Sequence, residues 1–136
     1  MQVTKMSGYG LIASLELAAS ARRDPIPASA IAKKYKLPVA FVGKILNQLK
    51  NAGLITAQKG RAGGYTFALD PAKVSLLQVL EALGESLDIV GCIDANSDCS
   101  LAPVCPTRNV WSELDRKFKD LLGSLSLREI IEADDD

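Results

Sequence analysis

This 136-residue chain contains three cysteines, which by their type and spacing are its candidates for reactive or ligand-binding residues. Cys92, Cys99 and Cys105 are its only cysteines, with six residues between the first pair and five between the second. The residues between them are rich in Asp, Asn, Ser and Pro, which is typical of a loop and not of a packed core. Three thiols gathered in one loop favour a bound cofactor or a thiol sensor over a role in packing.

The ligand set favours an iron–sulfur cluster, of the 2Fe–2S or 4Fe–4S type, over zinc. A structural zinc site usually has four Cys or His ligands at short spacing, whereas these spacings are longer and the chain has no histidine. Three thiolates with an oxygen or external fourth ligand suit a labile cluster, as a sensor requires. A switch in which two cysteines form a disulfide is the alternative. Candidate oxygen donors in the sequence are Glu85, Asp88, Asp94, Asn96 and Asp98.

Charge is divided unevenly along the chain, although the chain as a whole is neutral. Residues 1–65 carry ten Lys/Arg against two Asp/Glu, a balance of +8. Residues 66–136 carry six Lys/Arg against fourteen Asp/Glu, a balance of −8. A basic surface suits the phosphate backbone, so we expect the first half to bind double-stranded DNA and the second to be held away from it.

Composition narrows the class of protein. Hydrophobic residues make up 48% of the chain but aromatic residues only 5%, which favours helices. The sequence has neither an apolar run near the ~18 residues of a membrane span nor a signal-peptide pattern, so we expect a cytoplasmic protein that does not enter membranes. The absence of histidine, of a nucleophile–base motif and of a paired-carboxylate site argues against an enzyme.

The elements that must position these residues follow from apolar spacing and from helix-breaking residues. Helices are predicted over 5–21 with Thr4 as N-cap, over 28–35, 39–52 and 76–84, and over 106–122 with Pro106 opening the helix. Two strands, 54–58 and 65–69, flank a glycine-rich tip, and Ser126 and Glu129 cap a short final helix. This order predicts a mainly α fold with a small β-hairpin: a winged helix-turn-helix over 1–84, a cysteine loop over 85–105, and a C-terminal dimerisation segment over 106–136.

The third predicted helix has two distinct faces. Its apolar stripe, expected to pack inward, consists of Val42, Ile45, Leu46 and Leu49. Small residues on the other face allow close approach to DNA, and Lys44 and Asn47 can reach base edges in the major groove. At the hairpin tip, cations can contact phosphates or enter a minor groove. The predicted DNA-binding residues are Ala40, Gly43, Lys44, Asn47, Gln48, Lys59 and Arg61.

The long C-terminal helix carries an apolar seam with spacings of 3, 4, 3 and 4 residues, as in a coiled coil. The seam consists of Trp111, Leu114, Phe118, Leu121 and Leu125. We expect it to pair with its copy in a second subunit, with packing inside one chain as the alternative. A two-fold homodimer would present two recognition helices to a pseudo-palindromic operator.

These motifs together resemble the winged-helix iron–sulfur transcription regulators of the IscR/NsrR type. The matching stretches are Leu49-Lys50-Asn51-Ala52-Gly53-Leu54-Ile55, Lys59-Gly60-Arg61-Ala62-Gly63-Gly64-Tyr65, the three cysteines followed by Trp111, and Ser126-Leu127-Arg128-Glu129-Ile130-Ile131. The resemblance implies a homodimeric regulator whose Cys92, Cys99 and Cys105 hold an iron–sulfur cluster. It also implies that the state of this cluster sets DNA affinity or target choice in response to redox, nitric oxide or iron status.

The chain departs from this family pattern at the fourth cluster ligand. Some members have a histidine three residues after the last cysteine, where this chain has Arg108. Others use a carboxylate from the partner's first helix, near the position of Gly8 here. The alternative functions are a thiol-based redox-sensing regulator, and a small iron–sulfur electron carrier or scaffold that keeps a vestigial DNA-binding fold.

Overall fold

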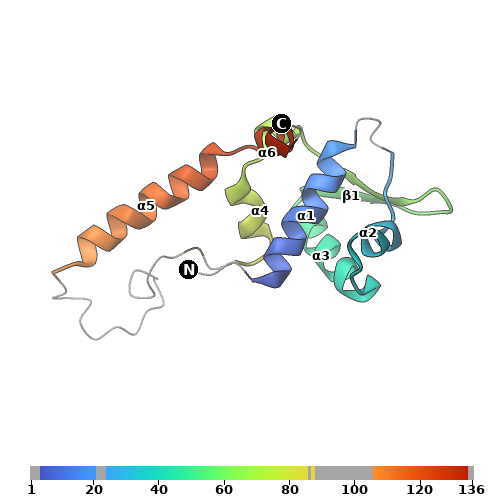
Figure 1. Cartoon of the computed structure of the whole chain (residues 1–136), viewed down its shortest axis with the longest axis horizontal. Coiled ribbons are helices and arrows are strands. Elements are labelled where there is room, and N and C mark those ends of the chain that lie inside the picture. The colour runs from blue at the N-terminus through green and yellow to red at the C-terminus, as the bar shows by residue number, and fades with distance from the viewer. Residues whose placement is uncertain (1–3, 21–23, 86, 88–105, 135–136) are drawn as a thin grey trace.

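The computed structural model describes residues 4–20, 24–85, 87 and 106–134. Six helices and one antiparallel hairpin lie in these ranges (Figure 1). This architecture confirms the predicted mainly α winged helix-turn-helix with a long helix near the C-terminus. The elements in chain order are α1 (Lys5–Ala19), α2 (Ala28–Tyr35), α3 (Val39–Asn51), β1 (Ile55–Gln58), β2 (Gly64–Phe67), the 3₁₀ turn η1 (Pro71–Lys73), α4 (Leu76–Ala82), α5 (Arg108–Ser124) and α6 (Leu127–Asp134).

Side-chain caps fix the starts of α1, α4 and α6. The Thr4 hydroxyl accepts the Ser7 N–H at 3.2 Å, and the Ser126 hydroxyl accepts the Glu129 N–H at 3.1 Å, as predicted. Several predicted helix ends were wrong by two residues: those of α1 and α4, and both ends of α5. Helix α1 stops at Ala19 because the backbone turns extended at the next residue. Helix α5 begins at Arg108, since Pro106 stands in the turn before it and not in its first turn.

The core forms where α1, α3, α4 and the hairpin meet. The predicted inward stripe of α3 is confirmed, because Val42, Ile45, Leu46 and Leu49 are each at most 1% exposed. The rings of Tyr9 on α1 and Phe41 on α3 meet edge to face, with centroids 5.9 Å apart. This packing fixes the orientation of α3, so that its remaining face stays at the surface.

The hairpin is anchored to the loop before α2. Backbone N–H groups of Ile26 and Tyr65 each donate to the other's carbonyl oxygen at 2.9 Å. Gly64, beside this bridge, has φ +154°, and a Cβ there would lie 2.5 Å from the Ile26 carbonyl carbon. Only glycine fits so close an approach of two backbones. The bridge joins two segments that lie far apart in the sequence, so local sequence signals do not predict it.

The two C-terminal helices take different paths. Figure 1 shows α5 extending away from the packed helices, whereas α6 returns to lie over α1. Leu127, the first residue of α6, is fully buried, and its N–H donates to the Val74 carbonyl at 2.9 Å. Helix α6 is therefore part of the same core as the winged helix. The division into segments 1–84, 85–105 and 106–136 stays a prediction.

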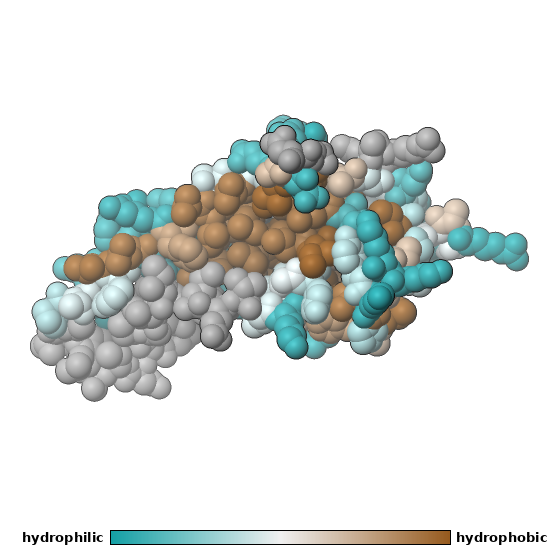
Figure 2. Space-filling model, viewed as in Figure 1, coloured by the Kyte–Doolittle hydropathy of each residue, from teal (hydrophilic) through white to brown (hydrophobic). Residues whose placement is uncertain are grey.

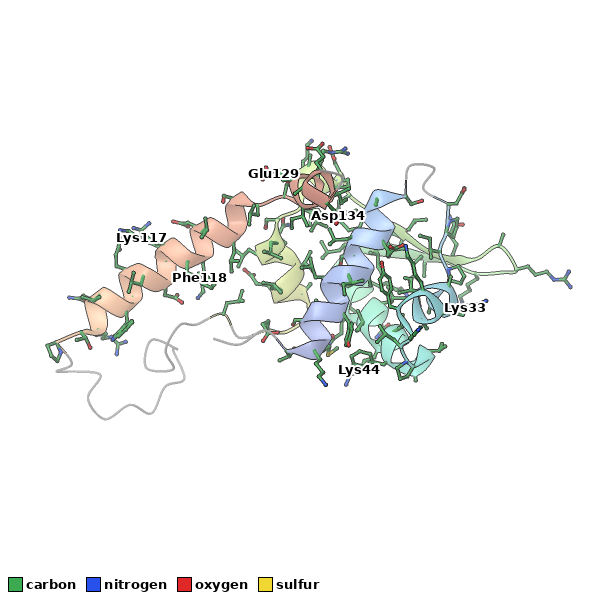
Figure 3. The ribbon with its side chains drawn as sticks, viewed as in Figure 1. Lys33, Lys44, Lys117, Phe118, Glu129 and Asp134 are labelled. Carbon is green, nitrogen blue, oxygen red and sulfur yellow. The ribbon has the colours of Figure 1, made fainter. Side chains whose placement is uncertain are left out.

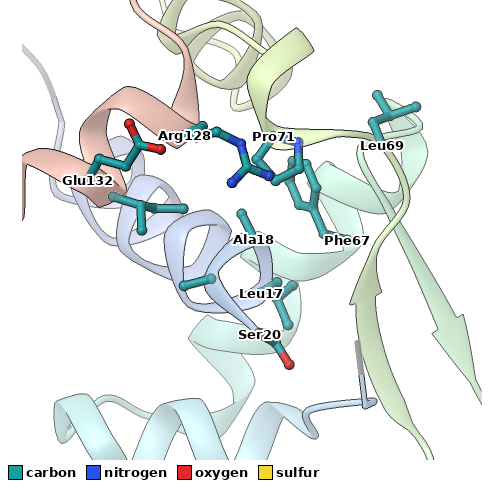
Figure 4. Close-up of a pocket in the computed structure, with 10 residues that line it drawn as sticks. Leu17, Ala18, Ser20, Phe67, Leu69, Pro71, Arg128 and Glu132 are labelled. Atoms are coloured by element: carbon teal, nitrogen blue, oxygen red, sulfur yellow. The ribbon is translucent and has the colours of Figure 1, made fainter. Parts of the chain in front are cut away.

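A cavity of about 280 Å³ marks the junction of α1, β2 and α6 (Figure 4). Leu17, Phe67 and Pro71 form part of its apolar lining, and Arg128 and Glu132 of α6 add charged groups. The Arg128 guanidinium lies 3.8 Å from the Asp70 carboxylate, which joins α6 to the end of the hairpin. No helix in the described part of the chain is long and apolar enough to span a bilayer.

Candidate nucleic-acid interface

The outward face of α3 is the first part of the candidate interface. Ala40, Lys44 and Asn47 are exposed, and Gly43 and Gln48 are half-buried. Figure 3 shows Lys44 projecting outward from its helix, away from the core. The Gln48 Oε1 atom is buried and finds no hydrogen-bond partner among the described residues, which places this residue at the flank of the face. The predicted base-reading residues therefore share one solvent-facing surface.

Gly43 is not required by the packing of the fold. A Cβ built at this position meets no atom within 4 Å, and the residue has ordinary helical geometry. Glycine inside a helix costs roughly 0.5–1 kcal/mol relative to alanine. Its presence at the centre of the outward face leaves a flat surface, which is what close approach to base edges needs.

The turn between α2 and α3 holds the two helices at a fixed angle. Lys36, the C-cap residue that follows α2, has φ +56°, a left-handed conformation that non-glycine residues adopt only at a cost. Pro38 then serves as N-cap of α3, with an extended backbone. This tight turn completes the helix-turn-helix.

A set of hydrogen bonds ties α2 to α1. The Glu16 carboxylate accepts from the Lys34 ammonium at 2.6 Å and from the Tyr35 hydroxyl at 2.5 Å. Burial acts to raise the pKa of Glu16, but these hydrogen bonds and the Lys34 charge together lower it below its ordinary value. Glu16 is thus held ionised at neutral pH, and α2 is fixed against the helix that carries the core.

The hairpin tip and the end of α3 form a shared groove. This groove has a volume of about 410 Å³, and its lining includes Lys50 from α3 and Lys59 from the tip. Arg61, also at the tip, is exposed. Gly60 has φ +107°, and a Cβ on Gly63 would lie 2.4 Å from the Gln58 carbonyl oxygen, so the tight tip depends on glycine. The sequence places Lys50 at the flank of the α3 face, where it could touch bases or phosphates, and the structure shows it exposed at this groove.

Helix α5 carries the predicted dimerisation seam on a largely uncovered surface. Leu114, Leu121 and Leu125 are 44%, 61% and 38% exposed, while Trp111 and Phe118 are half-buried. Phe118 packs against a small cluster with Leu80, Leu87 and Leu122. Figure 2 shows a continuous apolar band along α5 and onto α4. The sequence pattern missed one exposed apolar side chain of this helix, Val110, and one inward-facing residue, Leu122.

The predicted cluster ligands Cys92, Cys99 and Cys105 lie outside the described residues, as do Asp88, Asp94, Asn96 and Asp98. Within the described ranges, no group of three or more His, Cys, Asp or Glu side chains could hold a metal ion. Of the candidate oxygen donors only Glu85 is described, and its carboxylate accepts hydrogen bonds from Thr4. The cysteine site therefore stays a prediction from the sequence.

Known proteins resemble this chain over nearly its whole length. The HTH-type transcriptional regulator IscR of Vibrio cholerae is 27% identical over 131 residues, which cover 96% of this chain and 75% of that protein. The solved structure of CymR, the global cysteine regulator of B. subtilis, matches with a TM-score of 0.78 and 22% identity over 98% of both chains. The structure of T. potens IscR matches with a TM-score of 0.73 and 22% identity over 98% of this chain and 88% of that one.

The two structural matches confirm the fold, and the relative's name is that of a transcriptional regulator and not of an enzyme, as expected. The model of the Rrf2 family, described as iron-dependent transcriptional regulator, matches residues 3–133. The chain therefore belongs to the Rrf2 family of transcriptional regulators.

Proposed function

We propose that this protein is a homodimeric regulator in which α3 and the hairpin contact operator DNA and Cys92, Cys99 and Cys105 hold an iron–sulfur cluster. The state of that cluster sets DNA affinity or target choice. The observation that carries the proposal is the joint geometry of α3 and the hairpin. A solvent-facing surface with Lys44 and Asn47 adjoins a groove that Lys50 and Lys59 line.

DNA recognition would divide between these two surfaces. Lys44 can donate to guanine O6 and N7, and the Asn47 amide can pair with the N6 and N7 atoms of adenine. Lys59, Arg61 and Lys50 would neutralise phosphates on either side of the contacted groove, which fixes the register without reading sequence. Gly43 and Ala40 would let the helix backbone lie close to the bases.

The homodimer would form through α5. Exposed leucines on a helix that extends from the core gain stability when a second copy covers them, at roughly 25 cal/mol for each Å² of apolar surface buried. A two-fold interface uses the same surface on both subunits, and the seam of α5 is a surface of this kind. Pairing through α5 would also set the spacing of the two recognition helices along the DNA.

The cysteines supply a donor set that fits a cluster. Thiolate sulfur is the ligand that iron–sulfur clusters use, and three thiolates leave one position for another donor. The description of the family as iron-dependent supports iron as the metal. Bound iron would add a redox-active centre, and its loss would leave three free thiols.

The test is anaerobic purification followed by iron and sulfide analysis per chain, visible absorption, and DNA-binding titrations with and without the cluster. The variant Cys92→Ala/Cys99→Ala/Cys105→Ala should lack the chromophore, and its DNA affinity should equal that of the cluster-free protein. If the triple variant instead binds DNA as tightly as the cluster-loaded protein does, the cysteines do not regulate DNA binding.

The second candidate is a thiol-based regulator, favoured by the presence of three cysteines without a fourth Cys or any His. It predicts protein without iron whose DNA affinity changes when peroxide forms a disulfide and returns with dithiothreitol. An electron carrier or scaffold would instead hold a cluster and form no sequence-specific DNA complex. The same purification and titrations separate the three functions.

A further inference from the structure

The chain that leads towards the cysteines is fastened to the N-terminal end of α1. Glu85, seven residues before Cys92 in the sequence, accepts through Oε2 from the Thr4 N–H at 3.3 Å and from the Thr4 hydroxyl at 3.1 Å. The same Thr4 hydroxyl accepts the Ser7 N–H, so Glu85 belongs to the capping network of α1. A carboxylate at this end is also favoured by the positive pole of the helix dipole.

Two neighbouring contacts reinforce this attachment. The Ser7 hydroxyl is buried and has no hydrogen-bond partner among the described residues, but it lies close enough to the Glu85 carboxylate to favour its charged form. Ser7 and the two Thr4 donors outweigh burial and lower the pKa of Glu85, so that it is ionised at neutral pH. Leu83 packs directly on Gly10, where an added Cβ would lie 2.4 Å from the leucine Cδ1. Leu83 and Glu85 thus contact the first two turns of α1.

The same turns of α1 contact the recognition helix. Tyr9, the neighbour of Gly10, meets Phe41 of α3 edge to face at 5.9 Å between ring centroids. Phe41 lies in the first turn of α3, two residues before Gly43. The first two turns of α1 therefore contact both the residues that lead into the cysteine segment and the first turn of α3.

We propose that Glu85 is a positioning residue that couples the cysteine segment to α3 through the N-terminal end of α1. This inference rests on the proposed function, because it assumes that the cysteines carry the signal. When cluster binding moves the cysteine segment, the Glu85 carboxylate would stay against Thr4 and Ser7 or leave them, and Thr4 would then keep or lose its acceptor. The first turn of α1, and with it the Tyr9–Phe41 contact, would shift between two arrangements.

A purely structural role for Glu85 makes a different prediction. If the carboxylate only stabilised α1, its removal would weaken the cluster-loaded and cluster-free proteins alike, and the ratio of their DNA affinities would not change. Coupling is a difference between states, so removal of the coupling residue must change that ratio. The ratio is therefore the quantity to measure.

The experiment compares full-length wild type, Glu85→Ala, Glu85→Gln and the control Glu81→Ala, each cluster-loaded and cluster-free. Glu81 is an exposed carboxylate one turn earlier. The wild-type affinity ratio should lie within about 5–150, the usual range of coupling. In Glu85→Ala the ratio should fall to about 2 or less, whereas Glu85→Gln, which keeps an acceptor oxygen, and Glu81→Ala should stay near wild type.

Hydrogen exchange of the α1 amides supplies a readout independent of DNA. Cluster loading should change protection of the Ser7 and Gly8 amides in wild type and leave it unchanged in Glu85→Ala. Iron content and the thermal midpoint of the cluster-free form establish that each variant is folded and loaded. If Glu85→Ala keeps the wild-type ratio of cluster-loaded to cluster-free DNA affinity, the proposed coupling is wrong. If Glu85→Ala folds but cannot hold iron, Glu85 is a cluster ligand and not a positioning residue. A wild-type ratio of 1 would mean that the cluster does not change DNA affinity. That result would contradict the proposed function, and with it this inference.

Discussion

Removal of the two hairpin cations gives the sharpest test of the DNA interface. Lys59 and Arg61 lie at the exposed tip, which glycines at 60 and 63 hold in a tight turn. The double substitution Lys59→Ala/Arg61→Ala changes charge while leaving the glycines and the Ile26–Tyr65 bridge in place. We therefore expect no loss of folding, and a specific loss of phosphate contacts.

The size of the effect follows from counterion release. Two cations per chain in a two-fold dimer make at most four phosphate contacts, and each contributes about −0.9 to the slope of log K against log salt concentration. The variant slope should be shallower by up to about 3.6, and by about 1.8 if only one cation per chain reaches DNA. Raising the salt from 50 to 200 mM weakens DNA binding of both proteins. If four contacts are lost, this fold-loss of affinity should be roughly 100 times smaller in the variant than in wild type.

Fluorescence anisotropy with a labelled non-specific duplex measures this slope, because the electrostatic part of binding does not depend on sequence. Lys117→Ala, an exposed cation on α5, is the matched control and should leave the slope unchanged. A double variant with the wild-type slope would remove the hairpin from the DNA contacts and refute the reasoning.

Three further substitutions test other parts of the molecule. Gly43→Ala should raise the free energy of unfolding by roughly 0.5–1 kcal/mol in urea titrations yet weaken operator binding; tighter or equal binding would show that the α3 face does not approach DNA closely. Leu121→Asp should convert dimers to monomers in sedimentation without loss of the thermal midpoint of the monomer, because this side chain is 61% exposed; an intact dimer would contradict the α5 interface. Tyr35→Phe should cost about 1 kcal/mol at pH 7 by removing the hydrogen bond to Glu16. The pKa of Glu16 is lowered in the folded state, so this stabilisation is present above the ordinary value of 4.5 and is lost as pH falls through the folded-state pKa. Urea titrations at several pH values measure the difference in free energy of unfolding between wild type and Tyr35→Phe. If this difference stays constant down to acid pH, it arises from packing and not from the hydrogen bond to Glu16.

Much of the fold could be predicted because it depends on neighbours in the sequence. The Thr4 and Ser126 caps act on the amide three residues later, and the 3.6-residue period of α3 separates its buried stripe from its exposed face. For the same reason the sequence predicted which candidate DNA-binding residues would face solvent. Helix ends without a capping side chain, such as the start of α5, were predicted less well.

The sequence alone therefore determined the set of elements and their faces, and it predicts that the three thiols carry the chemistry of the chain's second half. The tertiary structure decided which elements meet: Ile26 with Tyr65, Leu127 with the core, and Glu85 with Thr4, 81 residues away. The periodicity of the sequence does not specify such pairs, because their members are far apart in the chain. In the sequence, a residue that makes a long-range contact looks like any other polar or apolar residue. Its partner is selected only when the hydrophobic core closes and brings the two segments together.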